Sequence, residues 1–258
     1  MKVMGILNIT PDSFYDGGQY NTTKTALKQA TKMIKDGADI IDIGAESSRP
    51  NAKAVSENIE QQKIIPVIKA VRKKFPKILI SVDTYKPETA KKALEAGADI
   101  VNDITGLKNA KMMQLIKDTN ASVIIMHMRG TPETMQQMTD YKNVTKEIFA
   151  FFKNKISDCK KLGIDTDKII IDPGIGFAKT KEQNFELLKN LKTFEKLKKT
   201  ILIGTSRKSF LGSTPEKRLY GSLASVCHSY LRGARIFRVH DVKETKEVLE
   251  IMEKIENA

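Results

Sequence analysis

The chain has 258 residues, 40% of them hydrophobic, and its 44 lysines and arginines against 31 aspartates and glutamates give a formal net charge of +13. This length fits either two small domains or one (β/α) barrel of about 250 residues. No segment approaches the roughly 18 consecutive apolar residues of a membrane span and no signal-peptide core follows the N-terminus, so we expect a cytoplasmic protein without a membrane partner.

Short β-branched runs alternate with longer charged stretches of helical period along the whole chain, which indicates βαβ units and a parallel sheet. We expect eight strands, at 3–9, 40–45, 78–84, 100–104, 122–128, 169–172, 201–205 and 235–239. They predict an α/β fold, a (β/α)8 TIM barrel, as a single domain over 1–258. The long irregular stretch 129–140 is expected to be a mobile loop after the fifth strand.

A short internal repeat supports the barrel. GADIID at 37–42, GADIVN at 97–102 and GARIFR at 233–238 each follow a helical stretch. We expect the glycine to stop the helix, the alanine to pack at the turn and a strand to begin. Five positions after each glycine stand Asp42, Asn102 and Arg238, which the common offset places toward the carboxyl ends of their strands.

The strand ends are far more polar than the strands that carry them. In a barrel of this kind the active site lies at the carboxyl ends. A single aspartate there is more often a helix cap or turn former than a catalyst, but several buried carboxylates in one cavity need cations or donor-rich ligands. The polar positions are Asn8, Asp42, Asp83, Asn102, Asp103, His127, Asp172, Ser206, Arg207, Lys208, Arg238 and His240.

These positions offer two kinds of recognition chemistry. Asp83, Asn102 and Asp172 present acceptors and an amide that suit a flat heterocycle with adjacent NH and NH2 donors. The groups suited to a multiply charged anion and to a hard divalent ion such as Mg²⁺ are Asn8, Ser48, Arg49, Arg238 and His240. A heterocycle that carries phosphate is therefore the expected ligand.

Three motifs have competing interpretations. DPGIGFAK at 172–179 contains GxG but lacks a third glycine and a following acidic residue, so a dinucleotide site is not indicated. In GTSRKSFLG at 204–212 we expect Lys208 to reach over the pocket rather than to belong to a simple basic turn. His127 stands among apolar residues and is expected to be a core histidine.

Cysteine content and charge distribution exclude further classes. Cys159 and Cys227 are far apart and have no metal-ligand spacing, so neither a disulfide framework nor a zinc site is indicated. The basic residues are spread over many helical segments without interleaved aromatic residues, so nucleic acid is not an expected partner.

Eight segments together resemble the dihydropteroate synthase family, in the family's order and over essentially the whole chain. The segments are GILNITPDSFYDGG, DIGAESSRP, SVDTYKPE, VNDITG, MHMRGTP, DPGIGFAK, GTSRKSF and RVHDV. The resemblance implies condensation of 6-hydroxymethyl-7,8-dihydropterin pyrophosphate with p-aminobenzoate to 7,8-dihydropteroate and pyrophosphate, through a dissociative pterin cation. It also implies Mg²⁺ as cofactor, inhibition by sulfonamides and a homodimer.

The resemblance also implies roles for individual residues. Those expected to bind the pterin are Asp42, Asp83, Asn102, Met126, Asp172, Phe177, Gly204, Lys208 and Arg238. Those expected to bind pyrophosphate are Asn8, Ser48, Arg49, Arg238 and His240, with Asn8 on the metal. Those expected near p-aminobenzoate are Phe14, Ser48, Pro50, Lys208 and Ser209. The residues expected to act in catalysis are Asp83, Lys208 and Asp16. The 10–18 loop is expected to become ordered over the bound substrates.

Two alternatives remain open from the sequence. A methyltetrahydrofolate:corrinoid methyltransferase would share the heterocycle-binding residues but would not need Arg49, His240 or a metal site. A catalytically silent pterin-binding paralogue would have lost the loop and anion residues, which are present here. Ala45, Ser48 and Ala178 replace the family's common Gly, Thr and Gly, which could alter sulfonamide affinity.

One helical face toward the C-terminus could serve either of two purposes. Its apolar residues are Leu219, Leu223, Val226 and Tyr230. The stripe could form the dimer interface or pack on the barrel, and the sequence favours neither.

Overall fold

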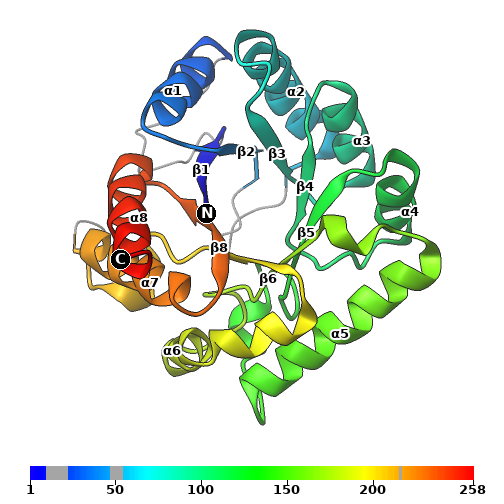
Figure 1. Ribbon diagram of the computed structural model, residues 1–258. Helices are drawn as coiled ribbons and strands as arrows, with labels where there is room; N and C mark the ends of the chain where they lie inside the picture. Colours follow the sequence, from blue (N-terminus) through cyan, green and yellow to red (C-terminus); the bar gives the residue numbers. More distant parts are fainter. Residues whose placement is uncertain (10–22, 47–54, 215–216) are drawn as a thin grey trace.

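The computed structural model describes residues 1–9, 23–46, 55–214 and 217–258, in which strands and helices alternate (Figure 1). The strands are β1 Lys2–Asn8, β2 Ile40–Gly44, β3 Leu79–Asp83, β4 Ile100–Asp103, β5 Ser122–Met126, β6 Ile169–Asp172, β7 Thr200–Ile203 and β8 Ala234–Val239. The helices are α1 Thr23–Lys35, α2 Glu57–Lys74, α3 Pro87–Glu95, α4 Ala110–Thr119, α5 Val144–Leu162, α6 Lys181–Lys189, α7 Arg218–Tyr230 and α8 Val242–Glu256. Short 3-10 segments are η1 Met135–Gln137, η2 Thr166–Lys168, η3 Leu191–Leu197 and η4 Ser209–Leu211.

The strands form one closed parallel barrel in chain order, in which β1 pairs with both β2 and β8. The helices surround this barrel (Figure 1). The predicted (β/α)8 fold is confirmed, and the strand boundaries differ from the predicted ones by at most two residues. Within the described ranges, no helix has both the length and the apolar character needed to cross a membrane.

Alternation of side chains along the strands places the site above an apolar floor. The floor inside the barrel consists of Met4, Ile40, Ile100, Ile124, Leu202 and Ile236, while the larger core lies between the strands and the helices. Side chains two positions apart on a strand share a face of the sheet. Asp42, Asn102 and Arg238 each follow a floor residue by two positions and therefore face the barrel interior one layer closer to the carboxyl ends.

The repeated glycines end helices, as predicted. Gly37, Gly97 and Gly233 have φ angles of 99°, 108° and 90°, a left-handed conformation that side chains disfavour. A Cβ atom on Gly97 would also lie 2.9 Å from Cγ of Arg72. Each glycine thus lets the chain turn from a helix into the next strand.

The stretch 129–140 after β5 contains more structure than the sequence pattern indicates. It includes η1, in which Met135 is buried. Arg129 lies 3.0 Å from Asp140 and stacks 3.8 Å from the ring centre of Tyr141, so contacts connect the two ends of the stretch.

Candidate active site

The carboxyl ends of the strands bring together the predicted site residues that the structure describes. Strands β1, β3, β5 and β6 end at Asn8, Asp83, Met126 and Asp172. Asp42, Asn102 and Arg238 lie within β2, β4 and β8, and Phe177, Gly204, Lys208, Ser209 and His240 lie in the segments after β6, β7 and β8. Phe14, Asp16, Ser48, Arg49 and Pro50 lie outside the described residues, so their roles remain predictions.

Arg238 links two carboxylates across the barrel. Its Nε donates to Asp42 Oδ2 and its Nη2 donates to Asp83 Oδ2, each at 2.6 Å. Asn102 Nδ2 donates to the same Asp42 oxygen at 3.3 Å. Because the Asp42 side chain is fully buried, this pairing compensates a charge that would otherwise be costly to bury.

Asp83 has a pKa near neutral pH. Burial raises its pKa to about 7, and the nearby carboxylates of Asp42, Glu60 and Glu46 act in the same direction. Arg238 opposes these effects. A shift of this kind in a buried group at the strand ends is typical of functional sites.

Asp172 and Lys208 lie beside the turn after β6. Asp172 Oδ1 accepts a hydrogen bond from the Gly174 N–H at 2.8 Å, and burial raises its pKa against the opposing charge of Lys208. The Lys208 ammonium group donates to the Ile175 carbonyl and lies 4.5 Å from the ring centre of Phe177. Burial lowers the pKa of Lys208 to about 8. Lys208 thus reaches from the β7 side to the turn that follows β6.

An apolar cluster lies at the β4 to β6 side of the strand ends. It consists of Ile104, Met126, Met128, Met135, Ala178, Tyr85 and Phe177. Methionine and aromatic side chains pack well against flat rings. This cluster and the carboxylates supply the apolar and polar contacts that a planar heterocycle requires.

Hydrogen bonds and an ion pair connect the segments that follow β7 and β8. The His240 N–H donates to Ser206 Oγ at 3.1 Å, and His240 Nδ1 lies 3.1 Å from the same oxygen. Arg207 donates from Nε and Nη2 to the two carboxylate oxygens of Asp241, at 2.8 and 2.5 Å. This bidentate pair fixes the position of His240 beside Arg207, so the structure gives Arg207 a bracing role.

His127 is buried, as the sequence predicts for a core histidine. Its ring contacts Phe151 edge-on with the centroids 5.0 Å apart. Burial lowers its pKa to about 2, with the charges of Lys179 and Arg129 acting in the same direction. The imidazole is therefore neutral near pH 7 and is not a source of protons for catalysis.

Sequence reasoning missed a buried ionic network beside Asp83. Lys86 Nζ lies 2.6 Å from Glu46 Oε2 and 3.2 Å from Glu60 Oε2, and the Tyr85 hydroxyl donates to Glu46 Oε1 at 2.8 Å. Glu60 is only 1% exposed although it belongs to helix α2. A carboxylate in a charged helix gives no sequence signal for burial, so only the packing of α2 on the barrel reveals this network.

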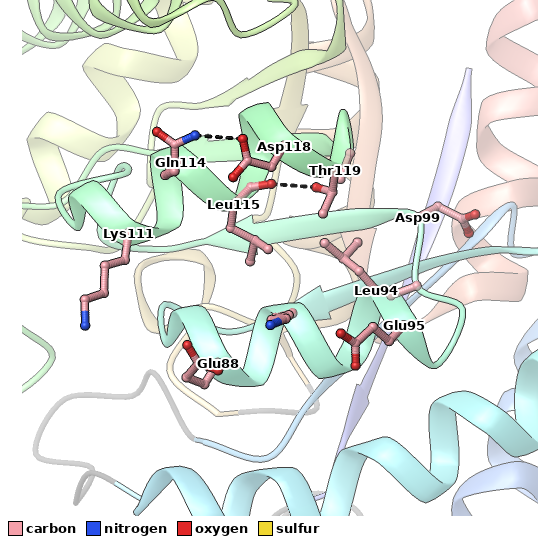
Figure 2. A pocket seen from close by; sticks show the side chains of 12 residues that line it. Glu88, Leu94, Glu95, Asp99, Lys111, Gln114, Leu115, Asp118 and Thr119 are labelled. Carbon is pink, nitrogen blue, oxygen red and sulfur yellow. Dashed lines mark hydrogen bonds between the residues drawn. The ribbon is translucent and has the colours of Figure 1, made fainter.

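A groove of about 830 Å³ between α3 and α4 lies away from the strand ends (Figure 2). Its lining includes the acidic residues Glu88, Glu95, Asp99 and Asp118 together with Lys91 and Lys111. Asp99 pairs with Arg72 at 2.6 Å, and Gln114 donates to Asp118 at 2.7 Å. These contacts indicate an ordinary charged surface between two helices.

Comparison with known proteins gives consistent matches over nearly the whole chain. Residues 4–240 match the family model described as pterin binding enzyme. The chain is 46% identical over 247 residues to the dihydropteroate synthase of Synechocystis sp., covering 93% of this chain and 85% of that one.

Two solved structures share the fold and a substantial part of the sequence. The dihydropteroate synthase of Yersinia pestis, solved in a sulfonamide drug complex, matches with a TM-score of 0.96 at 40% identity, covering 100% of this chain and 94% of that chain. The dihydropteroate synthase of Xanthomonas albilineans, in complex with 7,8-dihydropteroate, matches with a TM-score of 0.90 at 34% identity, covering 100% and 94%.

Proposed function

The chain belongs to the family of pterin-binding enzymes, and we propose that it acts as a dihydropteroate synthase. The reaction joins 6-hydroxymethyl-7,8-dihydropterin pyrophosphate to p-aminobenzoate and releases 7,8-dihydropteroate and pyrophosphate. The observation that carries the proposal is the pairing of Arg238 with fully buried Asp42 and with Asp83, at strand ends that also present Asn102 and Asp172. This set combines hydrogen-bond acceptors for a pterin with cations for a phosphorylated substrate.

The pterin is expected to lie across the carboxyl ends of β3, β4 and β6. Asp83, Asn102 and Asp172 would accept from and donate to the polar edge of the ring system. Lys208 would add a donor, and Arg238 would stack on the ring while Met126, Phe177 and Gly204 line the pocket. Asp42 is fully buried and accepts hydrogen bonds from Asn102 and Arg238. Its expected role is therefore to orient those two side chains beneath the ring.

The pyrophosphate is expected at the rim, near Arg238 and His240, with Ser48 and Arg49 as further partners. Within the described residues no group of three His, Cys, Asp or Glu side chains could hold a metal ion. A site with the Asn8 carbonyl, substrate phosphate oxygens and water still fits Mg²⁺, which commonly binds with few protein ligands. When bound, the ion would neutralise charge on the leaving pyrophosphate.

Departure of pyrophosphate would leave a cationic methylene group conjugated to the pterin. The Asp83 carboxylate is fixed by Arg238 and can stabilise this positive charge. The amine of p-aminobenzoate then attacks the methylene carbon, and the new C–N bond forms as the amine loses a proton. This sequence needs no strong base, but it needs a pocket that keeps competing water away.

The second substrate is expected above the pterin. Lys208 and Ser209 would contact p-aminobenzoate, together with Phe14, Ser48 and Pro50, and Asp16 would act from the 10–18 loop. A sulfonamide has the same arylamine and would compete for these contacts. The Lys208 bond to the Ile175 carbonyl would exchange for a ligand contact when the substrates bind.

A cytoplasmic homodimer is the expected form of the enzyme. Val226 of the predicted stripe is buried against the barrel, whereas α7 and α8 expose Tyr220, Ile251 and Ile255. These exposed apolar side chains support an interface between copies on this side of the barrel.

A direct assay tests the proposed function. Purified protein is given the dihydropterin pyrophosphate, labelled p-aminobenzoate and Mg²⁺, and labelled pteroate is measured with and without a sulfonamide and with a chelator. Magnesium-dependent product that the sulfonamide suppresses supports the proposal. Absence of pteroate from folded, pterin-binding protein would indicate a silent paralogue instead.

The Asp172→Asn variant is expected to bind the dihydropterin pyrophosphate about 10- to 100-fold more weakly, because a buried charged hydrogen bond contributes about 1.5–3 kcal/mol. Turnover at saturating substrate should change much less. Binding is measured by calorimetry without p-aminobenzoate, and kcat by product formation. An unchanged affinity with a large loss of kcat would contradict the assigned role.

The pH dependence of kcat/KM is expected to be a narrow bell. Asp83, with a pKa of about 7, loses its negative charge as the pH falls, and Lys208, with a pKa of about 8, loses its positive charge as the pH rises. Lys208→Arg should move the alkaline limb beyond about pH 10 and leave the acid limb in place. A flat profile between about pH 6 and pH 9 would count against both assignments.

A further inference from the structure

Lys179 is a lysine buried behind the candidate pterin site. Its side chain is at the end of the DPGIGFAK segment and the residue is only 4% exposed. Its Nζ lies 2.7 Å from the Phe177 carbonyl, 2.9 Å from the Gly174 carbonyl and 3.2 Å from His127 Nδ1. Burying a lysine is costly, so an interior lysine needs an explanation.

The contacts fit a protonated Lys179. An ammonium group has three N–H donors. Four acceptors surround it: the Gly174 and Phe177 carbonyls, the His127 carbonyl at 3.4 Å and the imidazole nitrogen. Burial lowers the pKa of Lys179 well below its ordinary range, and the positive charges of Lys208 and Arg129 act in the same direction. The carboxylate of Asp172 and the hydrogen-bond acceptors around Nζ oppose that shift and favour the charged form. His127 is neutral, so its Nδ1 can accept while its Nε2 carries the proton. The structure shows no carboxylate in direct contact with Lys179 among the described residues, so Asp172 is its main counter-charge.

Lys179 forms hydrogen bonds with the turn that positions Asp172. The Gly174 N–H donates to Asp172, while the Gly174 carbonyl accepts from Lys179. Gly174 has φ +70°, and a Cβ there would lie 2.0 Å from the His127 carbonyl oxygen, so the turn packs directly on the backbone just after β5. Ala178 has φ 51°, a conformation that is strained for alanine and persists only where the surroundings hold it.

The carbonyls of this turn are shared between two lysines. Lys179 binds those of Gly174 and Phe177 from within the protein, and Lys208 binds that of Ile175 from the pocket side. Asp172 interacts electrostatically with both ammonium groups. In the proposed function Lys208 contacts the substrates, whereas Lys179 is buried behind the turn and does not contact them.

We propose that Lys179 is a positioning residue of the pterin site: its ammonium group holds the Gly174–Phe177 turn and provides the fixed positive charge behind Asp172. The inference rests on the proposed function, because it assigns to Asp172 the recognition of the pterin. Lys179 acts through Asp172 and Phe177 and takes no part in bond formation.

The Lys179→Met variant is expected to bind the dihydropterin pyrophosphate about 10-fold or more weakly, with KM for p-aminobenzoate changed less than about twofold. The matched control is Lys181→Met, an exposed lysine at the start of α6, which should leave both values unchanged. A lower melting temperature with unchanged pterin affinity would assign Lys179 to stability alone and overturn the proposal.

A double-mutant cycle tests the link to Asp172. The loss of affinity caused by Lys179→Met should be at least about threefold smaller in an Asp172→Asn background, because the negative charge that Lys179 compensates is then absent. Equal losses in both backgrounds would overturn the proposal. Failure of the wild-type protein to bind the pterin would instead count against the proposed function.

Nitrogen NMR of the wild-type protein gives a measurement that does not depend on a folded variant. The chain has only three histidines, so the His127 signals can be assigned. We expect a neutral ring with the proton on Nε2 between about pH 5 and pH 9, because the Lys179 ammonium donates to Nδ1. A proton on Nδ1 would mean a neutral Lys179 amine and would refute the proposal.

Discussion

The Asp83→Asn variant is expected to lower kcat about 10²- to 10³-fold, because loss of one preorganised electrostatic contact in a buried site costs about 3–4 kcal/mol in the barrier. Asparagine has nearly the same shape and can still accept from Arg238, so the pocket should keep its form. Affinity for the dihydropterin pyrophosphate should change by less than about threefold, since the carboxylate matters most once the methylene group becomes cationic.

The matched control is Asp172→Asn, which also replaces an aspartate at the last position of a strand. That variant should lose mainly pterin affinity, whereas Asp83→Asn should lose mainly turnover. Single-turnover rates and calorimetric affinities of the two variants separate these effects. Equal losses in both parameters for both variants would mean that the two carboxylates do not have distinct roles.

The barrel and its polar strand ends could be predicted from the sequence because both depend on local regularities. The repeat that ends in Asp42, Asn102 and Arg238 combines a helix-stopping glycine with a period of two along the strand. In a parallel barrel all strands present their carboxyl ends at one face, so position within a strand is enough to place a residue near the site.

The pairing of these residues could not be predicted in the same way. The roles expected for Arg238 toward the pyrophosphate and the pterin ring stay predictions. Its hydrogen bonds to Asp42 and Asp83 have no signal in the sequence, because these residues come from strands far away in the chain. Glu60 and Lys179 were missed because a charged residue in a helix or after a turn is normally exposed. Only the three-dimensional packing shows that each is buried beside a site carboxylate.

Three of the carboxylates at the strand ends interact with three cations of the protein. The carboxylates are Asp42, Asp83 and Asp172, and the cations that interact with them are Arg238, Lys208 and Lys179. The sequence indicates that several carboxylates in one cavity need cations or donor-rich ligands, and the protein supplies cations from its own strands and turns. The pocket can therefore exist without ligand, and removal of one cation should destabilise the fold.

The Arg238→Met variant is expected to lose about 3–5 kcal/mol of unfolding free energy near neutral pH, because removing one partner of a buried ion pair leaves uncompensated charge. Asp42 is fully buried, and its Oδ1 has no protein hydrogen-bond partner within the described part of the chain, so it depends on Arg238. Urea denaturation measures the change, and Arg235→Met, at an exposed position of the same strand, is the control. A loss below about 1 kcal/mol would show that Arg238 is not needed for charge compensation.

The loss should also grow with pH. The pKa of Asp83 in the folded protein, about 7, lies above the ordinary aspartate value of 3.8, so the folded state binds this proton more tightly than the unfolded state. Stability from this group is therefore greatest at low pH and falls as the pH rises through the folded pKa. Arg238 lowers that pKa, so its removal raises the pKa and extends the fall to higher pH. The difference between variant and wild type should consequently be larger at about pH 8.5 than at about pH 6, whereas a difference independent of pH would place the cost of Arg238→Met in lost packing alone.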